Sequence, residues 1–424
     1  MKVSRPRVIM TLFLLLVSDP LVGSRVTTLL LTMIVSWTIL RRHFRVPKRP
    51  LLLLSLPSVL IVLGMVGSSS HYLRDVLKDG WYYTFPMLAV FAGYIIARDR
   101  RKPESLLLTF VAAGAVLSIW HLMEFFTHHN VLQSGDLSEL RDQIGGGFML
   151  SSVTPMIMFL ASRNGVQLFH SRLKVLRWPI YGVTLLSVAC AFSRTMVISA
   201  LISLVAGLGW LTAKNKRGMI VIGAMAAILL SLNAVVPGDS SSFVGKFAQT
   251  REEISFSDFG TTADAIHHWR AYETFMATAT YLGASSFQKA IGMGFGQLVD
   301  IGMDVELGGT VMREIPIFHN GYVYVLVKTG YVGVIVFLSY LARLYVVGAR
   351  HADMSDRRNR MFGGLLMAMV GMVAVSTFVV SGWFNPSLMC GIMVLIGCLL
   401  SFLSDQASEA EIATYREVGR ESYL

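Results

Sequence analysis

The chain has 424 residues, of which 54% are hydrophobic and 15% are charged, and its mean hydropathy is +0.59. A soluble domain needs more charged side chains on its surface, so this composition excludes an ordinary soluble protein and indicates that lipid surrounds most of the chain. The formal net charge of +11 is explained by the way membrane proteins distribute Lys and Arg, and it does not require nucleic acid as a partner.

Apolar runs long enough to cross a bilayer recur along the whole chain. A hydrocarbon core of about 30 Å requires about 20 apolar residues in a helix, whose backbone groups bond to one another. We expect twelve transmembrane helices, near residues 8–22, 24–40, 51–68, 81–97, 105–126, 146–162, 178–193, 195–213, 219–236, 330–348, 362–381 and 386–404. The sequence therefore predicts an all-α polytopic membrane protein.

The distribution of Lys and Arg predicts the orientation of these helices. Short loops rich in these residues stay on the cytoplasmic side during insertion. With the N-terminus in the cytoplasm, 26 of the 37 Lys and Arg residues fall in cytoplasmic segments. Both termini are therefore expected in the cytoplasm, the C-terminus as a tail at 405–424.

One connection is much longer than the others and divides the chain. Residues 237–318 form a large loop on the outer face, after nine helices in 1–236. An interfacial helix and the last three transmembrane helices follow in 319–404. The aromatic content of the loop and the helical pattern of 264–281 indicate that the loop is folded and partly helical.

The strongest local motif lies where this loop returns to the membrane, at residues 318–333. His319 is followed by Asn320-Gly321, and an imidazole at such a boundary can accept a proton from a hydroxyl group. Gly330 and Gly333 allow a break between a short interfacial helix and the tenth span. The alternative is an aromatic belt that contains a histidine with a purely structural role.

Two arginines on the outer face are the next candidates, because the topology rule gives no reason to place them there. Arg194 lies in the turn Ser193-Arg194-Thr195, and Arg270 lies on the helical part of the large loop. A guanidinium group binds phosphate oxygens in a bidentate manner and stays charged, which suits a diphosphate headgroup. The alternative for Arg194 is an interfacial position, or pairing with a carboxylate of the loop.

Other motifs do not predict a cofactor. Residues 292–296, Gly-Met-Gly-Phe-Gly, lack the spacing of a nucleotide-binding loop and are interpreted as a loop bend. The adjacent pairs His128-His129 and His267-His268 point to different sides of a helix and would chelate poorly. No outer Asp-x-Asp motif is present to hold a divalent ion. We therefore expect chemistry that needs no metal and no cofactor.

The order and spacing of the motifs resemble the O-antigen ligase and O-antigen polymerase superfamily. The resemblance is carried by His319-Asn320-Gly321 with Gly330 and Gly333, by the upstream Trp269-Arg270 and the glycine-rich 292–296, and by Ser193-Arg194-Thr195. The resemblance implies about twelve spans, one large periplasmic loop and an architecture like that of GT-C glycosyltransferases.

What the resemblance implies for function is glycan transfer at the periplasmic face of the bacterial inner membrane. The donor would be a polysaccharide on undecaprenyl diphosphate, and for a ligase the acceptor would be lipid A-core. By the resemblance, His319 would deprotonate or orient the acceptor hydroxyl, and Arg194 and Arg270 would hold the donor diphosphate. One-step displacement would invert the anomeric centre.

Three alternatives to a ligase remain open at this point. A polymerase of O-antigen or exopolysaccharide would share the same motifs. A transporter would need polar residues near the middle of the bilayer, whereas Asp19, His121 and Glu124 are predicted near the outer ends of their spans. A structural membrane protein would tolerate the replacement of His319 and both arginines.

Overall fold

The protein is a mainly helical, membrane-embedded protein. The structure, a computed structural model, describes residues 5–42, 55–68, 71–98, 102–128, 147–211, 220, 265–266, 268–307 and 310–421. Among these residues, six helices are long and apolar enough to cross a membrane. The prediction of a mainly helical membrane protein is therefore confirmed.

The helices before residue 212 follow the predicted spans with shifted ends. They are α1 (Arg5–Val22), α2 (Ser24–Arg42), α4 (Ser58–Val66), α5 (Leu73–Ala97), α6 (Pro103–Thr127), α8 (Met149–Arg163), α9 (Arg177–Cys190) and α10 (Arg194–Gly207), with a short 3-10 helix η3 (Ser171–Leu176) before α9. All of 237–264, and the predicted span at 219–236 except residue 220, lie outside the described residues.

The later elements comprise the helices and strands of the segment before residue 319 and the last three long helices. They are α14 (Trp269–Gly283), α15 (Ser286–Ile291), strands β1 (Val299–Leu307) and β2 (Thr310–Ile315), α16 (Gly321–Ala352), α17 (Arg357–Val380), the 3-10 helix η4 (Gly382–Phe384) and α18 (Pro386–Glu421).

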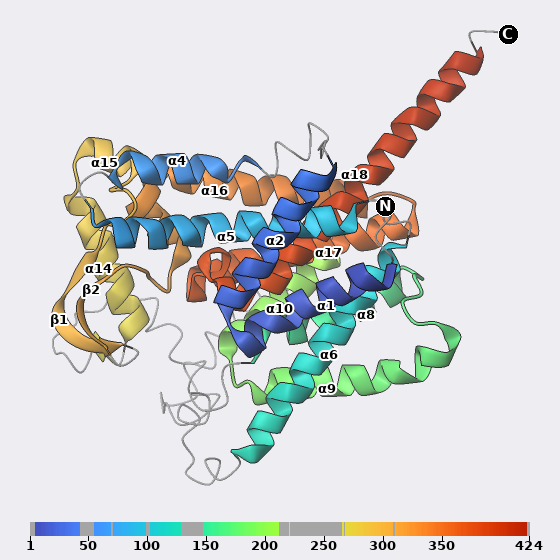
Figure 1. Ribbon diagram of the computed structural model, residues 1–424, viewed down its shortest axis with the longest axis horizontal. Helices are drawn as coiled ribbons and strands as arrows, with labels where there is room; N and C mark the ends of the chain where they lie inside the picture. The colour runs from blue at the N-terminus through green and yellow to red at the C-terminus, as the bar shows by residue number, and fades with distance from the viewer. Residues whose placement is uncertain are drawn as a thin grey trace.

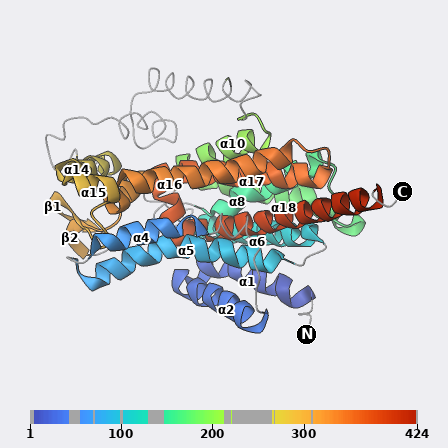
Figure 2. The same cartoon turned by 90° about the horizontal axis from the view of Figure 1, so that it is seen from above.

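Close helix packing holds the centre of the bundle together. α18 packs along α5, and α17 packs against both α16 and α10 (Figures 1 and 2). A Cβ on Gly93 of α5 would overlap the Val394 carbonyl oxygen of α18, and a Cβ on Gly397 would overlap the Val90 carbonyl oxygen. Small residues allow such backbone contact in lipid, where packing rather than the hydrophobic effect drives helix association.

The two ends of the bundle differ in what they carry. α14, α15, β1 and β2 lie at one end, here called the α14 end, and the start of α1 and the end of α18 lie toward the other, the terminal end (Figure 1). At the terminal end, Arg358 of α17 pairs with Glu104 of α6 at 2.8 Å. The basic segments predicted to be cytoplasmic at 163–177 and 343–360 meet there too, because Arg357 lies beside Gly165.

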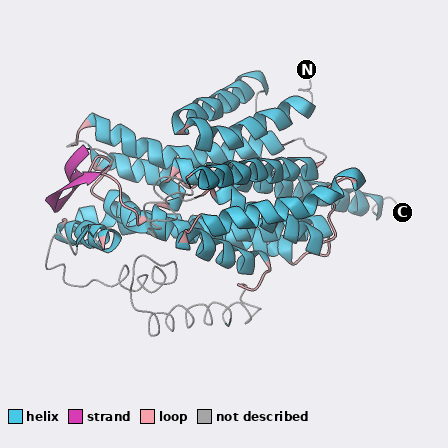
Figure 3. Ribbon diagram, turned by 90° about the horizontal axis from the view of Figure 1, so that it is seen from below, coloured by secondary structure: helices cyan, strands magenta, loops and turns pink. Residues whose placement is uncertain are grey.

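The all-α prediction is wrong for part of the large loop. β1 and β2 form an antiparallel hairpin, from Val299 opposite Ile315 to Leu307 opposite Thr310, with a register shift between Asp300 and Val305 (Figure 3). Apolar residues occupy every second position along β1, from Val299 to Leu307, which is typical of a strand, so the prediction of a partly helical loop omitted a signal that the sequence contains. The helix predicted at 264–281 is observed as α14.

The predicted number of twelve spans is not confirmed. Among the described residues, α4 has only 9 residues and α8 has 15, whereas a bilayer core requires about 20. α16 begins at Gly321, before the predicted span at 330–348. α18 continues as a helix to Glu421, through most of the segment predicted as a tail.

Candidate active site

α16 contains a sharp break at Gly330, and this break shapes the candidate site. Gly330 has φ of 67° and ψ of −174°, a region of backbone conformation that is essentially restricted to glycine. The Asn320 side chain caps the short segment before the break, because its Oδ1 accepts hydrogen bonds from the N–H groups of Tyr322 and Val323. The predicted break at Gly330 is confirmed, and the interfacial position of the segment before it stays a prediction.

The glycine-rich segment at 292–296 packs directly on the break. Met293 N–H donates to the Val327 carbonyl at 2.8 Å, and Gly294 N–H donates to the Lys328 carbonyl at 3.2 Å. A helix that breaks leaves its last carbonyls without intrahelical partners, and this loop supplies them. A Cβ on Gly292, whose φ is +92°, would overlap the Lys328 carbonyl. The interpretation of 292–296 as a loop bend is confirmed, with a specific structural role.

A buried ion pair reinforces the same junction. Lys328 Nζ lies 2.7 Å from Asp79 Oδ2, with both side chains almost fully buried. Asp79 also accepts hydrogen bonds from the Tyr324 hydroxyl at 2.5 Å and from Gly296 N–H at 2.7 Å, and Lys328 Nζ donates to the Gln297 carbonyl. A buried charge must be paired and hydrogen-bonded, so this network ties α5, the glycine-rich loop and α16 together.

His319 is held by a carboxylate from the large loop. Glu273 of α14 accepts two hydrogen bonds from it, one from the backbone N–H of His319 to Oε1 and one at Nδ1 to Oε2, each at 2.7 Å. The Glu273 side chain is 2% exposed, whereas the His319 side chain is 46% exposed. A carboxylate that accepts the proton on Nδ1 leaves Nε2 as the basic nitrogen of the ring.

The backbone around His319 is fixed by the end of α17. Ser381 N–H donates to the His319 carbonyl at 2.5 Å, and Ser381 Oγ donates to the Phe318 carbonyl at 2.6 Å. Ser381 adopts a left-handed conformation, with φ of 57°. His319 therefore lies where α14, α16 and α17 meet, with its orientation set from three sides.

Arg270 lies on α14, the helix that also carries Glu273. It precedes Glu273 by three residues in α14, and side chains three residues apart lie on one face of a helix. His319 therefore contacts the helix that carries Arg270, through Glu273, and the role of Arg270 at the site stays a prediction.

Arg194 lies at the same end of the bundle but on a separate element. It is the first residue of α10, capped by Ser193, whose side chain accepts from Met196 N–H at 3.3 Å. α10 runs antiparallel to α17, because Gly207 packs at Gly364 and Ser203 packs at Gly371. The start of α10 therefore points toward the end of α17, where Ser381 holds His319. The contacts of α10 are with α17 and α8 rather than with α14.

Three functional or structural residues were missed from the sequence: Glu273, Asp79 and Lys328. Glu273 could have been found from its position one helical turn after Arg270. Asp79 and Lys328 were predicted to lie just outside the spans, so the pairing of two charges 249 positions apart had no local signal. The prediction that ionisable groups in the helices are confined to Asp19, His121 and Glu124 is corrected by this pair.

Comparison of the chain with protein-family models and with curated proteins finds no match. The motifs of this sequence and the geometry around His319 are therefore the features that bear on function. The observation with the clearest chemical meaning is the exposed imidazole held by a buried carboxylate.

Proposed function

We propose that this protein is a glycosyltransferase that moves a polysaccharide from undecaprenyl diphosphate to lipid A-core, as an O-antigen ligase does, at the periplasmic face of the inner membrane. The observation that carries the proposal is the contact of Glu273 with His319 Nδ1, which keeps Nε2 exposed and basic. The residue types, their order along the chain and their gathering at the α14 end support it.

The proposed reaction is a single displacement. His319 Nε2 takes the proton of the acceptor hydroxyl while the hydroxyl oxygen attacks the anomeric carbon of the donor sugar. The bond from this carbon to the diphosphate oxygen breaks, and undecaprenyl diphosphate leaves with the bonding electrons. The new bond forms on the opposite face of the sugar, so the anomeric configuration inverts.

The two arginines are assigned to the leaving group. As the bond breaks, negative charge grows on the diphosphate, and preorganised cations lower the barrier by stabilising that charge. Arg270 is the nearer candidate, because it shares a helical face with Glu273. Arg194, at the start of α10, would contact the diphosphate from the other side. Guanidinium groups can supply this charge, so the proposed reaction needs no metal or other cofactor.

The experiment is complementation in cells that lack their own O-antigen ligase. The parent protein is expected to attach polysaccharide to lipid A-core, and His319→Ala is expected to abolish the attachment at equal membrane abundance. His128→Ala is the matched control, since His128 pairs with Glu124 at a longer 3.8 Å and both side chains are well exposed. This control should retain activity.

The outcomes separate the proposal from its alternatives. If the parent attaches nothing to lipid A-core but lengthens lipid-linked chains in a manner that needs His319, the protein is a polymerase of the same superfamily. If His319→Ala retains full ligase activity, the assignment of the base is wrong. A parent with neither activity would contradict glycan transfer and favour a transporter.

The buried ion pair does not favour a transporter. Asp79 and Lys328 are each bonded to several partners in the static junction of α5 and α16. A transport site near the middle of the bilayer would instead present polar groups to a passing substrate.

A further inference from the structure

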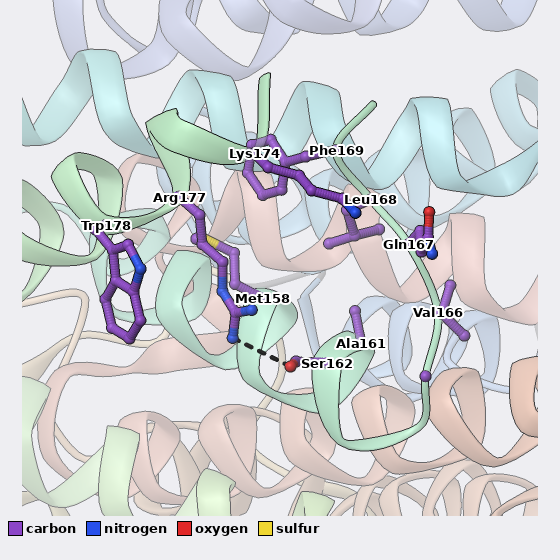
Figure 4. Close-up of a pocket in the computed structure, with 11 residues that line it drawn as sticks. Met158, Ala161, Ser162, Val166, Gln167, Leu168, Phe169, Lys174, Arg177 and Trp178 are labelled. Carbon is purple, nitrogen blue, oxygen red and sulfur yellow. Dashed lines mark hydrogen bonds between the residues drawn. The ribbon is translucent and has the colours of Figure 1, made fainter. Parts of the chain in front are cut away.

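A second polar site lies at the terminal end, far from His319. The end of α8, the loop at 164–170, η3 and the start of α9 enclose a cavity of about 450 Å³ (Figure 4). Its lining includes Ser162, Gly165, Gln167, Lys174, Arg177 and Trp178. None of the described residues that line it is acidic, so the charge of the cavity is positive.

Arg177 is held in place at the mouth of this cavity. Its guanidinium donates to Ser162 Oγ at 3.1 Å, and its Cζ lies 5.7 Å from the ring centre of Trp178 and 5.6 Å from that of Tyr181. Cation–π contacts of this length restrict the side chain while leaving other N–H groups of the guanidinium able to donate. Arg177 is therefore preorganised to bind an oxyanion.

Two further cations approach from other elements. Lys174 extends from η3 across the cavity toward Leu168 in Figure 4. Arg357, the first residue of α17, lies beside Gly165, with its Nη1 3.3 Å from the position a Cβ would take. Two cationic side chains thus line the cavity, and a third, from α17, lies beside one of its lining residues.

The cavity lies where a helix meets the membrane surface. Only 11% of the most apolar window of the η3–α9 segment is buried inside the protein, compared with 78% for α18. Trp178 is 73% exposed and Leu176 is 45% exposed. An apolar helix this exposed faces lipid, and Trp side chains prefer the level of the lipid headgroups. A ligand in the cavity would therefore have acyl chains beside it.

We propose that this cavity binds the phosphate-bearing headgroup of an anionic phospholipid, on the side that the charge distribution assigns to the cytoplasm. The phosphate oxygens accept hydrogen bonds from Arg177 and Lys174, and the acyl chains lie along the exposed face of α9 beside Trp178. Basic pockets between membrane helices on this side of the bilayer suit anionic headgroups.

The test uses the full-length protein purified in a neutral detergent. Binding is measured by titration with short-chain phosphatidylglycerol, with phosphatidylcholine and with inorganic phosphate, and is followed by the shift in the thermal unfolding midpoint. The variants are Lys174→Gln with Arg177→Gln, and Lys174→Gln alone. The matched control is Arg172→Gln with Arg350→Gln, which removes the same charge from exposed positions outside the cavity.

The parent is expected to bind phosphatidylglycerol, with little response to phosphatidylcholine. Loss of two charge-assisted hydrogen bonds should weaken binding about 10-fold or more in the double variant, and the control should bind like the parent. The single Lys174→Gln variant should lie between them, and it guards against misfolding because the Lys174 side chain is exposed.

Three results would overturn the proposal. Equal weakening in the control pair would show that the lipid responds to overall charge and not to this cavity. An equal response to inorganic phosphate at the same concentration would show a site for free phosphate instead of a lipid. Folded parent protein that does not respond to phosphatidylglycerol would also reject a lipid site.

Discussion

Two side-chain pairs that each include a carboxylate lie at the opposite ends of the short first segment of α16, and they differ in exposure. Lys328 and Asp79 are both enclosed, at 0% and 1% exposure, whereas Glu273 is 2% exposed and its partner His319 is 46% exposed. The nitrogen-to-oxygen distance is 2.7 Å in both. The enclosed pair can only hold the fold, while the other leaves one ring nitrogen facing outward, where a substrate can reach it.

The two pairs are mechanically related. The enclosed pair and the glycine-rich loop fix the segment from Asn320 to the break at Gly330, and His319 immediately precedes that segment. The enclosed pair therefore contributes to the site only by positioning His319. The following substitutions separate a loss of stability from a loss of the ability of His319 to act as a base.

The largest effect on folding is expected for Lys328→Met. The change leaves the buried Asp79 carboxylate without its cation, and breaking a buried pair in this way costs about 3–5 kcal/mol. We expect a large drop in the thermal unfolding midpoint and in the yield of monodisperse protein. Lys289→Met, on the neighbouring α15, is the control and should behave like the parent.

A double-variant cycle tests the coupling of this pair. Adding Asp79→Asn to Lys328→Met removes the unpaired charge, so the double variant should be more stable than the sum of the single effects predicts. Strict additivity would show that the two side chains act independently and that the junction is held by other contacts.

For Glu273→Gln we expect a lower rate of glycan transfer with an unchanged thermal unfolding midpoint. The amide oxygen can still accept the backbone N–H of His319, but the amide NH2 would face Nδ1 and favour the proton on Nε2 instead. A ring protonated on Nε2 cannot act as the base there, so the rate of glycan transfer should fall about 100-fold or more. The initial rate in membranes and the unfolding midpoint are measured together.

Glu124→Gln is the control for this change, because Glu124 also faces a histidine at the end of its helix. It should leave the rate unchanged. A normal rate in Glu273→Gln, combined with an inactive His319→Ala, would show that Glu273 only anchors the loop.

Gly330→Ala should cause an intermediate loss of stability. The backbone conformation at Gly330 costs about 1–3 kcal/mol for any other residue, and the new Cβ would overlap the Ala290 carbonyl. Gly182→Ala in α9 is the control, since nothing lies within 4 Å of the new Cβ, and it should be neutral or stabilise by up to about 1 kcal/mol. Unfolding midpoints of the two variants are compared, and equal midpoints would contradict the break as a structural requirement.

The parts of the fold that follow local patterns were predictable from the sequence. The break at Gly330 was predicted because two glycines interrupt an apolar run, and most helices follow apolar runs of suitable length. The position of His319 just before the start of α16 also follows from the local sequence, since Asn320 is a typical N-cap residue. By contrast, α4 is shorter than its apolar run, and the hairpin of β1 and β2 was not predicted although apolar and polar residues alternate along β1.

The contacts that define the site could not be predicted in the same way. Glu273 reaches His319 across 46 positions and Asp79 reaches Lys328 across 249, and no local periodicity encodes such pairs. The sequence supplied the kinds of residue that the proposed chemistry needs, and the folding of α14 against α16 decided which of them meet. Arg194 is a further example. Its motif was recognisable in the sequence, but its position relative to His319 depends on the packing of α10 on α17 and α8.

The smallest effect on stability is expected from breaking a third pair, in which both partners are exposed. Asp300 and Arg313 of the hairpin lie 3.2 Å apart, at 55% and 60% exposure. The Gly302 N–H and then Arg313 lower the pKa of Asp300 below its usual value of 3.8, so the pair stabilises the fold above that pH and loses this contribution as the pH falls through the lowered pKa. Solvent screens exposed pairs strongly. Asp300→Asn should therefore leave the unfolding midpoint at pH 7 unchanged within error, and should remove only a small dependence of the midpoint on pH below 4. A loss at pH 7 as large as that of Lys328→Met would show that burial is not what separates the three pairs.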